Sequence, residues 1–138
     1  MSAKDIFQAA FRAQKEIRIL QQRREHYLTL AMSVAGLSST PVQGGEKNSR
    51  TESAAIGLAE VADKLEKQAE QYLAAIRPAE ELIEKLDKPR HREVLSLHYL
   101  QGYSWGRVSV MMGYQDPKSV FRVHGWALLA ADKILNGR

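Results

Sequence analysis

Two long stretches of the chain space their apolar residues in alternating steps of three and four, and this rhythm restricts the fold more than any other feature. The first stretch keeps it over nine positions, eight of them apolar: Ile6, Ala10, Ala13, Ile17, Leu20, Arg24, Tyr27, Ala31 and Val34. The second keeps it over ten: Ala55, Leu58, Ala62, Leu65, Ala69, Tyr72, Ile76, Ala79, Ile83 and Leu86. Such heptad spacing is typical of helices that pack along one seam. We therefore predict a long antiparallel helical hairpin over residues 1–87.

Capping residues mark where the two helices of this hairpin begin. Ser2, followed three residues later by Asp5, is expected to cap the first helix, and Ser49 with Glu52 forms a capping box for the second. Residues 36–51 between them are rich in Gly, Ser, Thr and Pro and show no periodicity. We predict a loop over this segment.

The hairpin offers more apolar surface than two helices can bury. Six large apolar residues lie off the two seams: Phe7, Phe11, Leu28, Leu30, Leu73 and Leu82. They must face the C-terminal part of the chain or another chain, so we predict a homo-oligomer, with a dimer favoured. Pro78 stands within the second seam, where it is expected to kink the helix or to begin a second, abutting helix.

Positive charge is concentrated at the C-terminal end of the 138-residue chain. Residues 1–87 hold 12 Lys and Arg against 13 Asp and Glu, whereas residues 88–138 hold 8 against 3, so the net charge of +4 comes from the last third. A basic segment beside a near-neutral remainder indicates a polyanionic partner. No apolar run approaches the roughly 18 residues of a membrane span, the chain has no cysteine, and no signal peptide is recognisable. We expect a soluble, intracellular protein that does not engage a membrane.

The chain shows no pattern typical of a catalytic or metal site. Its four histidines do not have metal-ligand spacing among themselves or with acidic neighbours: His26, His91, His98 and His124. The carboxylates gather on the hairpin, and no nucleophile stands in a recognisable motif. We predict that the protein is not an enzyme and needs neither a metal nor a cofactor.

Residues 88–138 are predicted to form three helices with a tight turn before the last. Pro89 fits the first turn of the first helix, whose inward face is Val94, Leu95, Tyr99 and Leu100 and which ends at Gly102. Ser104 is expected to cap the second helix, with Trp105, Val108 and Met112 inward and Gly113 at its end. Asp116 and Pro117 are a cap residue and a first-turn proline in succession. The third helix is expected to bury Val120, Val123, Ala127, Leu128 and one of Ile134 and Leu135.

A short helix, a glycine-containing turn and a second helix with an apolar inner stripe describe a helix-turn-helix, whose second helix enters the DNA major groove. On that helix, residues 117–135, the outward side chains near the N-terminus are Lys118, Ser119 and Arg122. We predict that these three contact base edges. Periodicity alone leaves open a three-helix packing unit whose basic residues are merely solvated.

Five polar residues are predicted to hold DNA phosphates, which positions a protein on the duplex without specifying the sequence. They are Arg90, Arg92, Ser104, Arg107 and Gln115.

The motifs "REVLSLHYLQGYSWGRVSVMMGY" and "SVFRVHGWAL" resemble the region-4 helix-turn-helix of sigma-70-type factors. With "PVQGG" and "SRTE", the chain over roughly residues 40–128 resembles small phage and prophage proteins of low-GC Gram-positive bacteria, related to the RinA and ArpU late-gene transcriptional regulators. The resemblance implies a regulator of phage transcription in the bacterial cytoplasm that binds double-stranded DNA, with RNA polymerase as a candidate partner. His98 stands where the sigma pattern has an arginine, so a phosphate contact is not expected there.

We therefore predict an all-α protein with a helical hairpin at 1–87 and a sigma-region-4-like DNA-binding unit at 88–138. Two other functions fit the same pattern. One is a phage DNA-packaging component of the small-terminase type, in which the helix-turn-helix belongs to a ring-forming oligomer. The other is an interaction module that contacts only protein. The sequence does not specify the operator, the sign of regulation or the oligomeric state.

Overall fold

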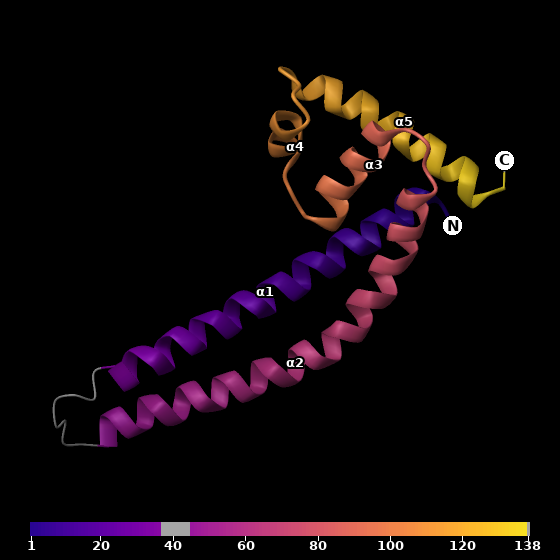
Figure 1. Ribbon diagram of the computed structural model, residues 1–138. Helices are drawn as coiled ribbons and strands as arrows, with labels where there is room; N and C mark the ends of the chain where they lie inside the picture. The colour runs from indigo at the N-terminus through magenta and orange to yellow at the C-terminus, as the bar shows by residue number, and fades with distance from the viewer. Residues whose placement is uncertain (37–44, 138) are drawn as a thin grey trace. The chain divides into compact units, whose positions relative to one another are not determined.

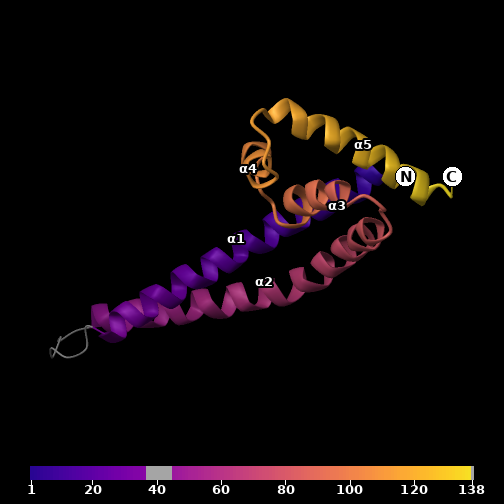
Figure 2. The same cartoon turned by 45° about the horizontal axis from the view of Figure 1, so that its top comes forward.

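The computed structural model describes residues 1–36 and 45–137 of the chain, with side chains described for 1–33 and 50–137. Every regular element in these ranges is helical, so the predicted all-α class is confirmed. Helices α1 (Ala3–Gly36) and α2 (Gly45–Glu84) form a long antiparallel pair (Figures 1 and 2). After them α3 (Pro89–Leu95), α4 (Trp105–Met111) and α5 (Pro117–Leu135) pack together.

The chain forms two compact units, and both long helices contribute to each of them. One unit consists of residues 1–15 and 71–138, and the other of residues 16–70. The first unit therefore contains the beginning of α1 and the end of α2 as well as the three shorter helices. Apolar residues on both sides of residue 87 share the core of this unit.

The core of the unit formed by residues 1–15 and 71–138 draws one inward face from each of its helices. Phe7 from α1, Ala79 from α2, Val94 from α3, Val108 from α4 and Val120 from α5 are all fully buried. Phe7 and Leu82, two of the residues that lie off the predicted seams, are buried in this core, and Phe11 packs partly against it. The expectation that such residues face the C-terminal part is confirmed for these three.

The start of α1 is capped as predicted. The Asp5 backbone N–H donates to Ser2 Oγ (3.2 Å), and the Ser2 backbone N–H donates to Asp5 Oδ2 (3.1 Å). The bond from the Ser2 backbone N–H, with a further contribution from the Ser2 side chain, lowers the pKa of the Asp5 carboxyl group, because it favours the charged form. The Ala3 N–H donates to Asp132 Oδ1 on α5 (2.8 Å), so the first turn of α1 is also tied to the last helix.

The predicted start of α2 is corrected, and one of the two alternatives at Pro78 is excluded. The helix begins at Gly45, four residues before Ser49, so the predicted cap at Ser49 is wrong, and residues 45–51 of the expected loop are helical. Of that loop, residues 37–44 lie outside the described residues. The helix also runs on through Pro78 as one element rather than two abutting helices. Proline lacks one backbone donor, and the packing of Ile76 and Ala79 on either side offsets that loss.

The predicted seam of α2 holds near its end but is displaced by one residue in the unit of residues 16–70. Ile76, Ala79, Ile83 and Leu86 are buried as expected. Further back, Ala55 and Ala62 are exposed, while Ala54, Gly57 and Val61 are buried in their place. The reason is the close approach of Tyr27: a Cβ built on Gly57 would lie 2.6 Å from its Cε1 atom. The Tyr27 ring therefore occupies the space that the missing side chain of Gly57 leaves, and this contact sets the register of α2 against α1.

Within the described ranges, no helix combines the length and the apolar character that crossing a bilayer requires.

Two glycines in the C-terminal part, each just after a helix, provide a matched test of how closely Gln14 of α1 packs against Gly102. Gly102 and Gly113 have φ of +78° and +79°, values that cost an L-residue about 1–2 kcal/mol. A Cβ on Gly102 would also lie 2.5 Å from Oε1 of the buried Gln14, whereas one on Gly113 would meet nothing within 4 Å. We expect Gly113→Ala to lower the free energy of unfolding by about 1–2 kcal/mol and Gly102→Ala to lower it further. Urea unfolding of both variants measures the difference, and equal losses would contradict the close contact with Gln14.

Candidate nucleic-acid interface

Helix α4 is set in place by its first residue and by its inner face. Ser104 has extended backbone angles, and its Oγ accepts the Arg107 N–H at 3.3 Å, as predicted for a cap. Val108 and Met112 are buried and Trp105 is half-buried, so all three predicted inward residues face the core. The opposite face of α4, with Arg107 and Val110, is exposed.

The turn from α4 to α5 is closed by hydrogen bonds of its own. Gly113 adopts its positive φ directly after Met112, and the Tyr114 N–H donates to the Ser109 carbonyl at 2.9 Å. The buried Ser109 hydroxyl donates to the Tyr114 carbonyl at 3.4 Å. Buried polar groups that are paired in this way hold a loop in one conformation. The turn therefore fixes the direction in which α5 leaves α4.

Helix α5 starts and faces as the sequence predicted. Asp116 Oδ1 accepts the Lys118 N–H at 3.0 Å, and Pro117 occupies the first helical position. The buried stripe contains the expected Val120, Val123 and Ala127, and also Ala131. Leu128 and Ile134 are half-buried, and Leu135 is exposed. The remaining face of the helix is free of the protein's own described side chains along most of its length.

The three residues predicted to contact bases are placed together but are not equally accessible. Lys118 and Arg122 are exposed one turn apart on the outward face of α5, and Ser119 between them is half-buried. A lysine and an arginine at this spacing present several N–H donors toward the same region of space. The Ser119 hydroxyl has less freedom to reach a ligand.

Three of the predicted phosphate contacts lie at the N-cap of α4, on α4 itself and on the turn after it. Ser104, Arg107 and Gln115 are exposed. Of these, Arg107 supplies the positive charge.

Arg90 of α3 is brought to the same turn by an aromatic side chain. Its guanidinium carbon lies 4.8 Å from the centre of the Tyr114 ring, and its Nη1–H donates to the Tyr114 hydroxyl. A guanidinium stacked on a ring keeps its charge and still presents other N–H groups to solvent. Arg90 therefore adds a positioned cation beside the start of α5.

Arg92 is placed differently. It is half-buried, and its Nη1–H donates to the Leu86 carbonyl in the loop between α2 and α3 (2.5 Å). This bond links α3 to the preceding loop, so the side chain has a structural partner that a phosphate would have to replace.

A row of rings, which periodicity alone could not reveal, braces the helix-turn-helix from inside. His98 stacks between Phe11 (ring centroids 4.8 Å) and Trp105 (3.8 Å), and Trp105 meets Phe121 of α5 edge-on at 5.6 Å. His98 Nδ1 lies 2.8 Å from the Tyr103 carbonyl and must therefore donate to it. Burial lowers the pKa of His98, although that carbonyl opposes the shift. His98 is thus a packing residue.

His124 on α5 lies at the inner end of these rings. Its Nε2 is 2.7 Å from the Tyr99 hydroxyl, and its ring centre is 4.5 Å from that of Trp105. Burial, with smaller contributions from His98 and Lys4, lowers the pKa of His124 to about 4. The imidazole is therefore neutral at pH 7, and it positions α5 rather than adding charge to the interface.

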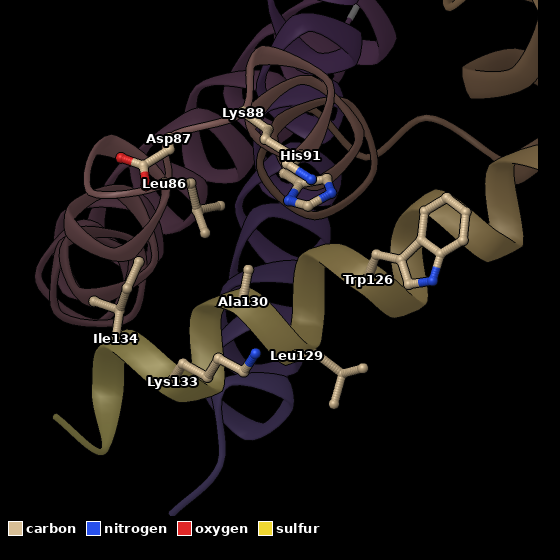
Figure 3. Close-up of a pocket in the computed structure, with 9 residues that line it drawn as sticks. All are labelled: Leu86, Asp87, Lys88, His91, Trp126, Leu129, Ala130, Lys133 and Ile134. Atoms are coloured by element: carbon tan, nitrogen blue, oxygen red, sulfur yellow. The ribbon is translucent and has the colours of Figure 1, made fainter. Parts of the chain in front are cut away.

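Past its first two turns, the outward side of α5 becomes apolar. Trp126 and Leu129 are 57% and 61% exposed, and they border a groove of about 660 Å³ whose other walls include Leu86, Lys88 and His91 (Figure 3). Exposed apolar groups of this size are typical of protein contacts, and they offer nothing to phosphates. The outward side thus carries Lys118 and Arg122 near its N-terminus, and Trp126 and Leu129 further along, with Lys133 beside the groove.

Within the described ranges, no three His, Cys, Asp or Glu side chains gather in a way that could hold a metal ion. No protein-family model matches the chain, and no curated protein or solved structure is significantly similar to it. The resemblance to phage regulators therefore stays a prediction. A function has to be argued from the geometry of α3, α4 and α5.

The lowered pKa of His124 predicts a loss of stability in mild acid. Below about pH 6.5 the unfolded chain binds a proton at this position, whereas the folded chain does so only near pH 4, so the free energy of unfolding falls as the pH drops through this window. We expect a fall of about 1–2 kcal/mol, allowing for partial exposure. His124→Gln, which can still form a hydrogen bond with Tyr99, should reduce the slope of the free energy of unfolding against pH. Chemical unfolding between pH 4 and 7 tests this, and an unchanged slope in the variant would contradict it.

Proposed function

We propose that the protein is a sequence-specific, double-stranded DNA-binding regulator of transcription that inserts the N-terminal half of α5 into the major groove. The observation that carries the proposal is the orientation of this helix. Its stripe of Val120, Val123 and Ala127 is buried, while Lys118 and Arg122 on the opposite side are exposed. The major groove is wide enough for an α-helix, and its base edges are hydrogen-bond partners for such side chains.

The cations around α5 support this mode of binding. Arg107 is exposed on α4, and Arg90 is held against Tyr114 in the turn that precedes α5. In a helix-turn-helix the helix before the turn crosses the DNA backbone, where such residues neutralise phosphates. Residues 88–138 carry a net charge of +5, which favours a polyanion over a neutral partner.

The remaining parts of the proposal rest on the resemblance and on exposed apolar residues. We assign the activity to phage or prophage transcription in a bacterial cytoplasm, with RNA polymerase as a candidate partner. In the unit of residues 16–70, four large apolar side chains are exposed: Ile19, Leu30, Met32 and Ile56. They favour a second copy of the hairpin as a partner. We propose that the protein acts by binding, without catalysis.

Two other functions are separated from this one by the mass of the protein in solution. We expect a dimer, whose two half-sites would lie about one helical turn apart or a multiple of that. A ring of many copies would favour a packaging component instead. The exposed Trp126 and Leu129 also suit a module that binds only protein, which predicts no salt-dependent binding to any duplex. Light scattering with and without DNA distinguishes these cases.

The assignment of individual residues predicts two different kinds of loss. Arg107→Ala removes a phosphate contact, so it should weaken binding to selected and random duplexes alike and reduce the slope of log affinity against log salt by about 0.9. Arg122→Ala should weaken the selected duplex more, by about 1–3 kcal/mol. Fluorescence anisotropy at several salt concentrations gives both quantities.

Lys133→Ala is the matched control for these variants. It removes one positive charge from the exposed surface of the same helix, beside the apolar groove and far along α5 from Lys118. It should change specific binding little. If its loss equals that of Arg122→Ala, only the net charge matters, and α5 does not bind in the proposed orientation.

A further inference from the structure

Phe121 is a large apolar side chain placed among charged ones. Its side chain is 48% exposed, and it lies between Lys118 and Arg122 near the start of α5, where both neighbours are also exposed. An aromatic ring that is half in water loses the stabilisation that full burial would provide. The exposed position of the ring is explained if a ligand that binds Lys118 and Arg122 also covers Phe121.

The ring of Phe121 is held from behind. Trp105 meets it edge-on with centroids 5.6 Å apart, and Trp105 is itself stacked on His98 at 3.8 Å. Edge-to-face pairs of this kind are favourable arrangements of aromatic rings. The exposed part of Phe121 is therefore already ordered before a ligand arrives, which reduces the entropy that binding would cost.

The helix next to this ring can approach a surface closely. Gly125 follows Phe121 by one turn, and a Cβ built on it would meet nothing within 4 Å. A glycine inside a helix destabilises it relative to alanine, so bare backbone on the outward side of α5 is explained by close contact with a ligand. Such contact would bring Phe121 within reach of groups at the floor of a groove.

The major groove of DNA offers one apolar group at its floor. Adenine, guanine and cytosine present hydrogen-bond donors and acceptors there, while thymine adds its C5-methyl group. Phenylalanine has no donor or acceptor, so the other base edges give it nothing to pair with. We propose that Phe121 packs against a thymine C5-methyl group of the target and thereby selects an A·T pair, an inference that rests on the proposed function of α5.

The experiment begins with selection of bound duplexes from a random library by the full-length protein. In the selected duplex each thymine is then replaced in turn by deoxyuridine, which removes only the methyl group. We expect one or two such positions to weaken binding about fourfold each, the equivalent of burying one methyl group. Replacement at the other positions should have no effect.

Variants of the protein connect this methyl group to Phe121. Phe121→Ala should bind the thymine and deoxyuridine duplexes equally, because the contacting ring is gone. Phe121→Gln, of similar length but polar, carries the same expectation if the alanine variant loses its fold by circular dichroism. Trp126→Ala is the matched control: it removes an exposed aromatic residue from the C-terminal half of α5 and should keep the fourfold sensitivity.

The outcomes separate the inference from the proposal beneath it. If a duplex is selected but no deoxyuridine replacement matters, or if Phe121→Ala keeps the sensitivity, then Phe121 does not contact thymine, while DNA binding by α5 stands. If the library yields no preferred duplex, the proposed sequence-specific function is overturned and this inference with it.

Discussion

The burial of one stripe of apolar side chains on α5 determines which of its other side chains face outward. Val120, Val123, Ala127 and Ala131 fill the same core as Phe7 of α1. Because side chains three and four apart share one face of a helix, burying these four leaves Lys118 and Arg122 pointing outward. Rotating α5 to hide its cations would expose that stripe and bury unpaired charges, which is strongly unfavourable.

Polar contacts make this orientation more specific than apolar packing alone would. The Ser109 hydroxyl and the Gly113 turn fix the exit from α4, and Asp132 accepts the Ala3 N–H from the first turn of α1. His124 pairs with Tyr99 inside the same unit. Each of these bonds requires one alignment of its donor and acceptor, so together they restrict how α5 can slide or turn against the core.

The outward side of α5 combines two surfaces with different chemistry. Its first two turns carry Lys118 and Arg122, and its later turns carry Trp126 and Leu129 beside an apolar groove. Phosphates and base edges suit the first surface, whereas only an apolar partner would cover the second. One helix therefore presents a basic surface near its N-terminus and large exposed apolar side chains further along.

The sequence by itself determined the elements that depend on local interactions. The caps at Ser2, Ser104 and Asp116, the left-handed glycine at Gly113 and the inward stripe of α5 all follow from neighbouring residues. Local patterns also grouped Lys118 with Arg122. Ser49 looked like an equally good cap, yet α2 begins four residues before it, at Gly45.

Only the tertiary structure decided features that depend on residues distant in the sequence. The seam of α2 shifts where Tyr27 of α1 packs on Gly57. The row of rings joins Phe11 of α1, through His98 and Trp105, to Phe121 of α5. Periodicity assigns a residue to a face but does not say which distant side chain will meet it there, because that contact depends on how separate helices pack.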